Sequence, residues 1–508
     1  MSLCWFLFWG CAHKPAVESV DETAGSDRLV VLHTNDLHGH FLPERAPWLD
    51  GEPAIGGFSL LDAHVQAVRE EFGESQVLLL DGGDILTGTP LTDIEVRGSQ
   101  GGAMLEFMEL VGYDAWVLGN HEFDKGFENT AKLVASSRIP VLSSNLDGTD
   151  GGVAMEGLLD SVVLDKGGLK VGVVGATTMG LGHLASTATM SNMTLRPLSE
   201  TVAEQVALLD PQTDLVVVLS HIGLEADRRL AEEVSGIDLI VGGHSHTYLP
   251  EPEKVNGTWI VQAGSYGRSI GRLELGVKDD AIASFQGEIV DLVPDSVTGS
   301  VRSEMSDLVA KYEQIITEEF GEVLSKADAT LSRSYHFESD LGNWITDVLR
   351  EAGGTDLAFY NVGGLRADLV KGDVTTGSIY EIFPFGNQVV TFEISASELL
   401  GVMLSNARVS LEQNHGSIQQ SGVEMTWRER METPEVVSIT VGGAPFDPDA
   451  IYTVTSNSYV AEQANRYLAG AQPANLRGLG ATVFDVATAA ARTGPIRKPV
   501  DGRLQKVE

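Results

Sequence analysis

Five short segments in the first half of the chain combine aspartate, asparagine or histidine with glycine. They are residues 33–39 (HTNDLHG), 81–84 (DGGD), 119–124 (GNHEFD), 220–223 (SHIG) and 242–246 (GGHSH). Carboxylate oxygens and imidazole nitrogens together suit divalent Mn, Zn, Mg or Fe, and glycine allows the sharp turns that aim such side chains. One Asp before Gly is usually a turn residue, and a lone His is usually structural. Five such segments together favour a metal site.

Short apolar runs alternate with helical patterns and would position these segments. The runs are residues 29–33, 77–80, 115–118, 141–143, 171–174, 215–219, 239–241 and 259–262, and the helical patterns include 60–72 and 203–209. This alternation predicts an α/β domain in layers, with strands buried on both faces. Ligands gather at the carboxyl ends of strands in such sheets. We therefore expect the five segments to meet.

The length of the chain predicts two domains. A single core rarely grows beyond about 250–300 residues, and this chain has 508. We assign residues 28–300 to a first domain and 327–508 to a second. Residues 301–326 have apolar positions at helical intervals and are predicted to form a connecting helix.

The charge of the chain limits its partners. A formal net charge of −38 repels DNA and RNA backbones, so no nucleic acid polymer is expected as a partner. The two cysteines, Cys4 and Cys11, both lie near the N-terminus, which excludes disulfides and thiolate zinc sites from the folded body.

The N-terminal 27 residues resemble an export signal followed by a polar tether. Residues 3–10 are apolar like the core of a signal peptide, and residues 8–11 (FWGC) resemble the lipobox of bacterial lipoproteins. We expect export to the periplasm or cell surface, with Cys11 as a lipid anchor and the only membrane contact. The alternative is an unprocessed tail. No other segment is apolar for 18 residues, so the body is not expected to cross a membrane.

The five segments closely resemble the calcineurin-like metallophosphoesterase signature (D-x-H, GD, GNHE, H, GHxH). The resemblance implies a four-layer domain with a two-sheet core and a dinuclear site. It assigns the first metal to Asp36, His38 and His246, the second to Asn120, His221 and His244, and the bridging position to Asp84. His121 would stabilise the transferring phosphoryl group and protonate the leaving oxygen, and Asp124 would orient His121. The alternative for Asp124 is a helix N-cap.

The second domain resembles the C-terminal domain of bacterial 5′-nucleotidases. Residues 361–368 (NVGGLRAD), 382–387 (IFPFGN) and 339–343 (SDLGN) match its motifs. The resemblance implies an α+β domain that binds the nucleoside. Arg366 would bind the phosphate or ribose region, Phe385 and Tyr459 would stack on the base, and Asn361 would also bind the substrate. The alternative for both aromatics is core packing. Residues 462–467 (EQANRY) replace a glycine-rich motif, so nucleotide preference is expected to be altered or broad.

Together these features predict an enzyme that uses two divalent ions, Mn, Zn, Mg or similar, to hydrolyse nucleotides by attack of a metal-bound hydroxide. We expect the active site in a cleft between the domains, with domain motion for substrate exchange. Alternatives of the same architecture are a 2′,3′-cyclic nucleotide phosphodiesterase, a nucleotide-sugar hydrolase and a thiosulfohydrolase. A non-catalytic surface module that binds nucleotides is the alternative from another class.

Overall fold

The computed structural model describes the chain except for residues 1–15, 19–26, 150, 413–416, 500–501 and 508. The chain forms two compact units. The first contains the residues up to Thr87 and Leu91–Tyr312, and the second contains Gly88–Pro90 and the residues from Glu313 onward. Cys4, Cys11 and the expected export signal lie outside the described residues. Strand β1 (Ala16–Glu18) lies within the expected tether and pairs with β20 (Ile282–Asp291). Part of the expected polar tether therefore forms a strand in a sheet of the first unit.

Within the described residues, the first unit contains two large sheets and three two-stranded ones. The order in the larger is β1, β20, β19 (Ser269–Val277), β2 (Asp27–Thr34), β5 (Val77–Asp81), β8 (Ala115–Val117), β9 (Val141–Leu142) and β11 (Leu158–Leu159). The order in the smaller is β12 (Ser161–Lys166), β13 (Leu169–Thr177), β15 (Leu215–His221), β16 (Leu239–Val241), β18 (Thr258–Val261) and β17 (Glu253–Val255). The neighbours β2, β5, β8 and β9 are parallel, as are β13, β15, β16 and β18. Each of the eight predicted apolar runs coincides with one of these parallel strands.

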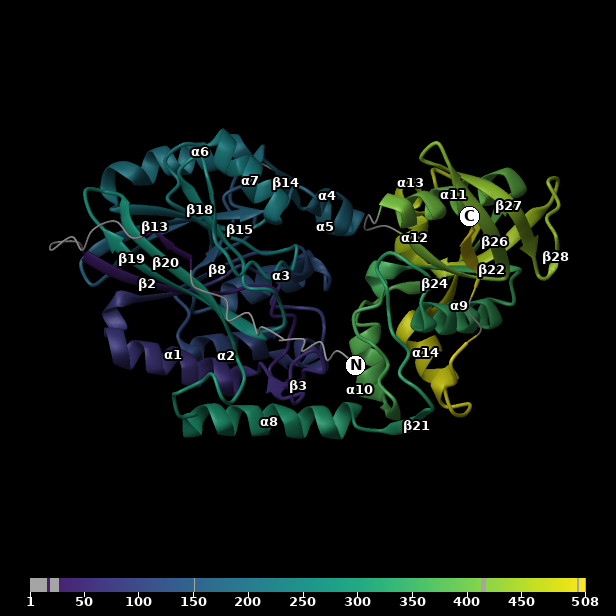
Figure 1. The fold of residues 1–508 in the computed structure, drawn as a ribbon, viewed down its shortest axis with the longest axis horizontal. Coiled ribbons are helices and arrows are strands. Elements are labelled where there is room, and N and C mark those ends of the chain that lie inside the picture. Colours follow the sequence, from purple (N-terminus) through teal and green to yellow (C-terminus); the bar gives the residue numbers. More distant parts are fainter. Residues whose placement is uncertain (1–15, 19–26, 150, 413–416, 500–501, 508) are drawn as a thin grey trace, which may run out of the picture. The chain divides into compact units, whose positions relative to one another are not determined.

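The two sheets pack face to face around a shared core. Fully buried residues of both sheets belong to it, including Leu29 of β2, Val173 of β13 and Val217 of β15. Helices α6 (Leu198–Leu209) and α7 (Leu224–Glu233) cover the outer face of the smaller sheet. Helices α1 (Phe58–Phe72) and α2 (Gly102–Val111) lie on the opposite side of the strands (Figure 1). This arrangement confirms the four-layer fold with a two-sheet core.

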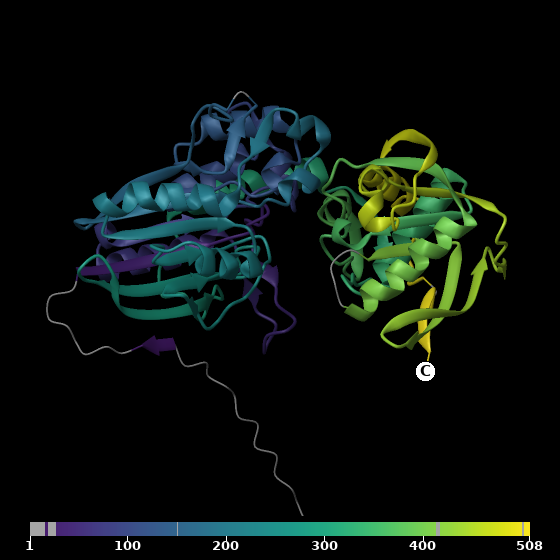
Figure 2. The same cartoon turned by 90° about the horizontal axis from the view of Figure 1, so that it is seen from above.

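The second unit combines helices with a mixed sheet, which agrees with the predicted α+β class. The strand order is β25 (Ile418–Ser421), β22 (Leu357–Asn361), β29 (Ile451–Asn457), β24 (Gln388–Ser395) and β30 (Ala474–Thr482). Helix α11 (Ala396–Glu412) packs on one face, and α9 (Asp340–Gly353) and α14 (Val483–Ala491) pack on the other. A second sheet contains β28 (Ala444–Pro445), β27 (Thr433–Val441), β26 (Val423–Arg430) and β31 (Leu504–Val507). Strand β31, yellow in Figure 2, runs parallel to β26.

The predicted connecting helix at 301–326 is shorter in the structure. Helix α8 covers Ser303–Phe320, and β21 (Val323–Ala327) pairs with β23 (Gly372–Thr375). Gly321 follows the last helical residue, where its low helix propensity favours termination. The prediction was wrong for the last turns because these residues pair with β23. That strand lies about 45 residues away in the sequence, so no local pattern indicated the pairing. Within the described residues, no helix has both the length and the apolar character needed to cross a bilayer.

Candidate metal centre

The five predicted segments begin at the carboxyl ends of parallel strands from both sheets of the first unit. The candidate ligands belong to β2 and its loop (Asp36, His38), the β5 loop (Asp84), the β8 loop (Asn120), β15 (His221) and the β16 loop (His244, His246). Five of the seven are buried, and His244 and His246 are half-buried. The structure therefore brings all seven predicted metal ligands to one end of the sheet pair.

The backbone of these loops is strained at the candidate ligands. The φ angle is positive at Asp36 (53°), His38 (48°), Asp84 (56°), His244 (75°) and His246 (53°). A residue other than glycine rarely adopts this left-handed conformation, which costs roughly 1–2 kcal/mol. Strain of this kind persists where the surrounding structure imposes it, and it clusters at functional sites.

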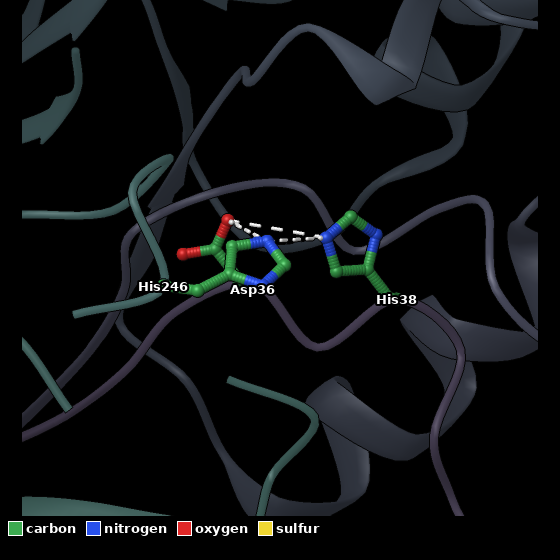
Figure 3. A group of neighbouring side chains, drawn as sticks. All are labelled: Asp36, His38 and His246. Atoms are coloured by element: carbon green, nitrogen blue, oxygen red, sulfur yellow. Dashed lines mark hydrogen bonds and ion pairs between the residues drawn. The ribbon is translucent and has the colours of Figure 1, made fainter. Parts of the chain in front are cut away.

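The donor atoms of the predicted ligands form two neighbouring groups, and a third group joins His38 and Asp84 to His121. In the first, Nε2 of His246 lies 3.3 Å and Nε2 of His38 lies 3.9 Å from Oδ1 of Asp36 (Figure 3). In the second, Nε2 of His221 lies 3.0 Å from Oδ2 of Asp84, and His244 completes the group. Oδ2 of Asp84 also lies 3.9 Å from Nε2 of His38. Asp84 thus occupies the position between the two groups.

Hydrogen bonds prepare these side chains to bind cations. Nδ1 of His38 lies 2.9 Å from the carbonyl oxygen of Leu86, and Nδ1 of His221 lies 2.6 Å from that of Gly82. Because a carbonyl oxygen can only accept, each Nδ1 carries a proton, and Nε2 is the ring nitrogen that faces the other donor groups. Oδ1 of Asn120 is buried without a hydrogen-bond partner, which is costly unless a ligand satisfies it. The residues fit divalent metal ions.

The electrostatics of the centre favour a cation beside Asp84. Burial opposes the charge on Asp84, but His221, His121 and His38 hold the pKa of that carboxyl well below its usual range. Burial also opposes a charge on His221, but the Asp84 carboxylate raises the pKa of that imidazole to about 10, so a bound metal ion would replace the proton on Nε2. Burial lowers the pKa of His244 to about 4, so this imidazole is neutral near pH 7 and can offer a lone pair.

The predicted dyad is present at the edge of this centre. Nδ1 of His121 lies 2.7 Å from Oδ2 of Asp124, and Nε2 of His121 lies 3.9 Å from Oδ2 of Asp84. The backbone N–H of His121 donates to the other oxygen of Asp84 at 2.8 Å. Gly126, not Asp124, precedes the next helix, α3 (Phe127–Ser136). The alternative that Asp124 is a helix N-cap is therefore wrong, since Asp124 instead follows the short 3-10 helix His121–Phe123 as its C-cap.

The predicted nucleoside-binding residues gather at one edge of the five-stranded sheet in the second unit. Asn361 ends β22 and accepts a hydrogen bond from Asn457 at the end of β29 (2.8 Å). The Arg366 guanidinium lies 5.9 Å from the centre of the Phe385 ring, just before β24. Tyr459 follows β29 in α12 (Ser458–Glu462). Phe385 and Tyr459 are half-buried, so neither is a fully buried core residue.

Two family models match the chain. Residues 29–248 match the calcineurin-like phosphoesterase model, and residues 316–470 match the model of the 5′-nucleotidase C-terminal domain. The chain therefore combines a calcineurin-like phosphoesterase domain with a 5′-nucleotidase C-terminal domain.

Relatives with this pair of domains match the chain over both units. A mouse 5′-nucleotidase is 27% identical over 497 residues, which are 86% of this chain and 83% of that protein. The crystal structure of a 5′-nucleotidase precursor from Thermus thermophilus has a TM-score of 0.84 and 27% identity, and covers 95% of this chain and 100% of that one. A trifunctional nucleotide phosphoesterase of Bacillus subtilis is 27% identical over 532 residues, and the match spans only 35% of that longer protein.

Sequence reasoning missed the residues that hold the ligand loops. Glu122, within the family's GNHE segment, is fully buried. Its carboxylate accepts four backbone N–H groups, from Gly119 (2.6 Å), Asp84 (3.2 Å), Ile85 (2.8 Å) and Leu86 (3.3 Å). One buried side chain therefore joins the loop of Asp84 to the loop of Asn120. The sequence did contain a signal for Glu122, because this glutamate lies inside a segment of candidate ligands but has no assigned role as a ligand.

Two buried amides hold the remaining loops. The Asn35 amide donates to Oδ2 of Asp36 and to the carbonyl oxygen of Gly264, each at 2.6 Å. The Gln262 amide donates to the carbonyl oxygen of Gly243 at 2.8 Å and accepts the N–H of Thr247 at 2.5 Å. In the second unit, Tyr467 was also missed; its ring lies 5.8 Å from that of Tyr459. Gln262 falls outside the matched motifs, so the sequence offered no signal for it, whereas Tyr467 ends the 462–467 segment that replaces the glycine-rich motif.

Proposed function

We propose that this protein is a phosphomonoesterase that hydrolyses nucleotides with two divalent metal ions. The observation that carries the proposal is the pair of donor groups meeting at Asp84, next to the His121–Asp124 dyad. A module that only binds nucleotides has no need of such a dyad. The 5′-nucleotidases that match both units support the same substrate class.

The proposed ligand sets follow the two donor groups. One ion would be held by Asp36, His38 and His246, the other by Asn120, His221 and His244, with Asp84 between them. When bound, two divalent ions neutralise phosphoryl charge and lower the pKa of coordinated water. The candidate metals are those expected from the sequence, namely Mn, Zn, Mg or similar, because nitrogen and oxygen donors suit each of them.

His121 is the proposed proton donor. Asp124 accepts from Nδ1 of His121, so this bond fixes the tautomer and turns Nε2 toward the centre. A proton on Nε2 can then pass to the oxygen that leaves the phosphorus. An imidazolium also stabilises the negative charge of the transferring phosphoryl group.

The first domain, 28–300, is proposed to perform the chemistry, and the second, 327–508, to select the nucleoside. Metal ions recognise only the phosphoryl group, so base and ribose contacts must come from other residues. Arg366 offers a planar fork of donors for an anion, and Asn361 offers an amide. Phe385 and Tyr459 would stack on the base, each contact contributing about 1–3 kcal/mol.

A substrate comparison tests the function. Protein stripped with a chelator and restored with Mn²⁺ is assayed on AMP, nitrophenyl phosphate, UDP-glucose, 2′,3′-cyclic AMP and protein-bound thiosulfate. We expect AMP to have the highest kcat/KM and the stripped protein to be inactive. Turnover of the cyclic nucleotide or UDP-glucose without turnover of AMP would replace the monoesterase assignment with the corresponding alternative. Nucleotide binding without turnover of any substrate would favour a non-catalytic module.

Export is also proposed, with lipid attachment at Cys11. The apolar N-terminal segment followed by FWGC supports it. Labelled palmitate should mark the protein and should not mark Cys11→Ser. Recovery of the native protein from the cytosol with residues 1–10 attached would contradict the proposal.

A further inference from the structure

Thr87 is a strained residue between the metal centre and the dyad. It lies in the loop after β5, is fully buried, and has a φ angle of 62°. A β-branched residue in the left-handed region is a genuine outlier. The next residue, Gly88, would tolerate this conformation freely, but its φ angle is not positive. Such strain persists only where contacts impose it.

Two polar contacts impose this backbone conformation on Thr87. The Thr87 hydroxyl donates to Oδ2 of Asp124 at 2.7 Å. The Thr87 carbonyl oxygen lies 2.8 Å from Nδ1 of the metal-ligand candidate His38. One residue therefore contacts both a residue of the first donor group and the carboxylate of the dyad.

The hydroxyl contact determines how Asp124 can act. Oδ2 of Asp124 accepts from both Thr87 and Nδ1 of His121, each at 2.7 Å. Two donors that converge on one oxygen restrict rotation of the carboxyl group. Since that oxygen orients the His121 ring, the same restriction directs Nε2 of His121 toward the centre. Nothing in the matched motifs assigns a role to Thr87.

We propose that Thr87 is a positioning residue that aligns the His121–Asp124 dyad with the metal centre through its hydroxyl. The inference rests on the proposed function, because it requires His121 to protonate the leaving oxygen. Loss of the hydroxyl should leave phosphate binding intact and slow proton delivery. The deficit should therefore grow as the leaving group becomes more basic.

The test uses isosteric and matched variants on aryl phosphates of rising leaving-group basicity. Thr87→Val removes the hydroxyl and keeps the shape. We expect kcat to fall about 10- to 100-fold on the most basic leaving group, within the usual range of acid–base contributions, and only a few-fold on nitrophenyl phosphate. KM and the bound metal count should not change. Thr87→Ser should retain most of the activity.

A matched control and a backup pair complete the design. Thr258 is also buried, and its hydroxyl donates to the carbonyl oxygen of Ile237 at 2.8 Å, so Thr258→Val loses an equivalent bond away from the dyad and should keep full activity. If Thr87→Val does not fold, Thr87→Ser and Thr87→Ala still differ by one hydroxyl.

Three results would overturn the inference. Equal losses on all leaving groups, or loss of metal, would make Thr87 a support for His38 only. A Ser variant as slow as the Val or Ala variant would show that the hydroxyl is not responsible. Unchanged rates in every variant would remove any role for Thr87. Aryl phosphates keep this test separate from the proposal that the substrate is a nucleotide. If AMP is not cleaved, that proposal fails, but the aryl phosphate series still measures the effect of Thr87.

Discussion

Glu122→Gln should destabilise the first unit and weaken metal binding together. Oε1 of Glu122 accepts the N–H groups of Ile85 and Leu86, and Oε2 accepts those of Gly119 and Asp84. A glutamine has one acceptor oxygen, so either amide orientation leaves two buried N–H groups facing an NH₂ group. Both loops that carry Asp84 and Asn120 then lose part of their support.

The magnitude follows from these bonds. A hydrogen bond to a charged group contributes about 1.5–3 kcal/mol, so two lost bonds amount to roughly 3–6 kcal/mol. Burial, followed by Asp84, raises the pKa of Glu122 to about 7, so the native carboxylate already carries a desolvation penalty that the amide avoids. We therefore expect a net loss of about 2–4 kcal/mol in the free energy of unfolding. Metal affinity should fall by about 10- to 100-fold, as is usual when residues that support ligands are changed.

Thermal unfolding and elemental analysis would measure both effects. A change of 1 kcal/mol shifts Tm by about 2–4 °C in domains of 150–250 residues, so Tm should fall by roughly 4–16 °C. Glu232 is exposed at the end of α7, and Glu232→Gln is a matched control that should change stability by less than about 0.5 kcal/mol. An unchanged Tm and metal content in Glu122→Gln, or an equal effect in the control, would refute this account of the loops.

Four further changes test other parts of the molecule. Asp84→Asn should abolish phosphatase activity and lower the bound metal count, and full activity would exclude Asp84 from the centre. His121→Ala should keep its metals and lose about 10²–10⁴-fold in kcat; metal loss would instead make His121 a ligand. Phe385→Ala should raise KM for AMP by roughly five- to 150-fold, the equivalent of ~1–3 kcal/mol of stacking, and spare nitrophenyl phosphate, whereas equal losses would indicate a folding role. Burial, then Arg272, lowers the pKa of His64 to about 4. Folding favours the neutral form of His64, so His64 lowers the free energy of unfolding as pH falls from 6.5 toward 4. Measured by urea unfolding, that free energy should decline less over this pH range in His64→Gln than in the native protein. An identical decline would contradict the assignment.

Much of the first unit could be predicted because its signals are local. Each parallel strand is a near-continuous apolar run, and burial on both faces requires that composition whatever the neighbours are. The candidate ligands stand directly after these strands, so the strand ends and the chemistry of the side chains were sufficient to place Asp36, Asp84 and His244 together. The dyad also has a local signal, because His121 and Asp124 are three residues apart.

The contacts that orient these residues depend on tertiary structure alone. Thr87 reaches Asp124 across 37 residues of sequence, and Asn35 reaches Gly264 across 229. Glu122 and Gln262 likewise act on backbone groups of distant loops, and the same side chains would be solvated in the isolated segments. The end of α8 was missed for a similar reason, since β21 exists only where β23 pairs with it. The amino-acid sequence determined the layers, the family and the donor atoms, because burial and donor chemistry belong to each segment by itself. Tertiary structure alone decided how those atoms are aimed, because a hydrogen bond or a strained φ angle needs a partner that no local pattern specifies.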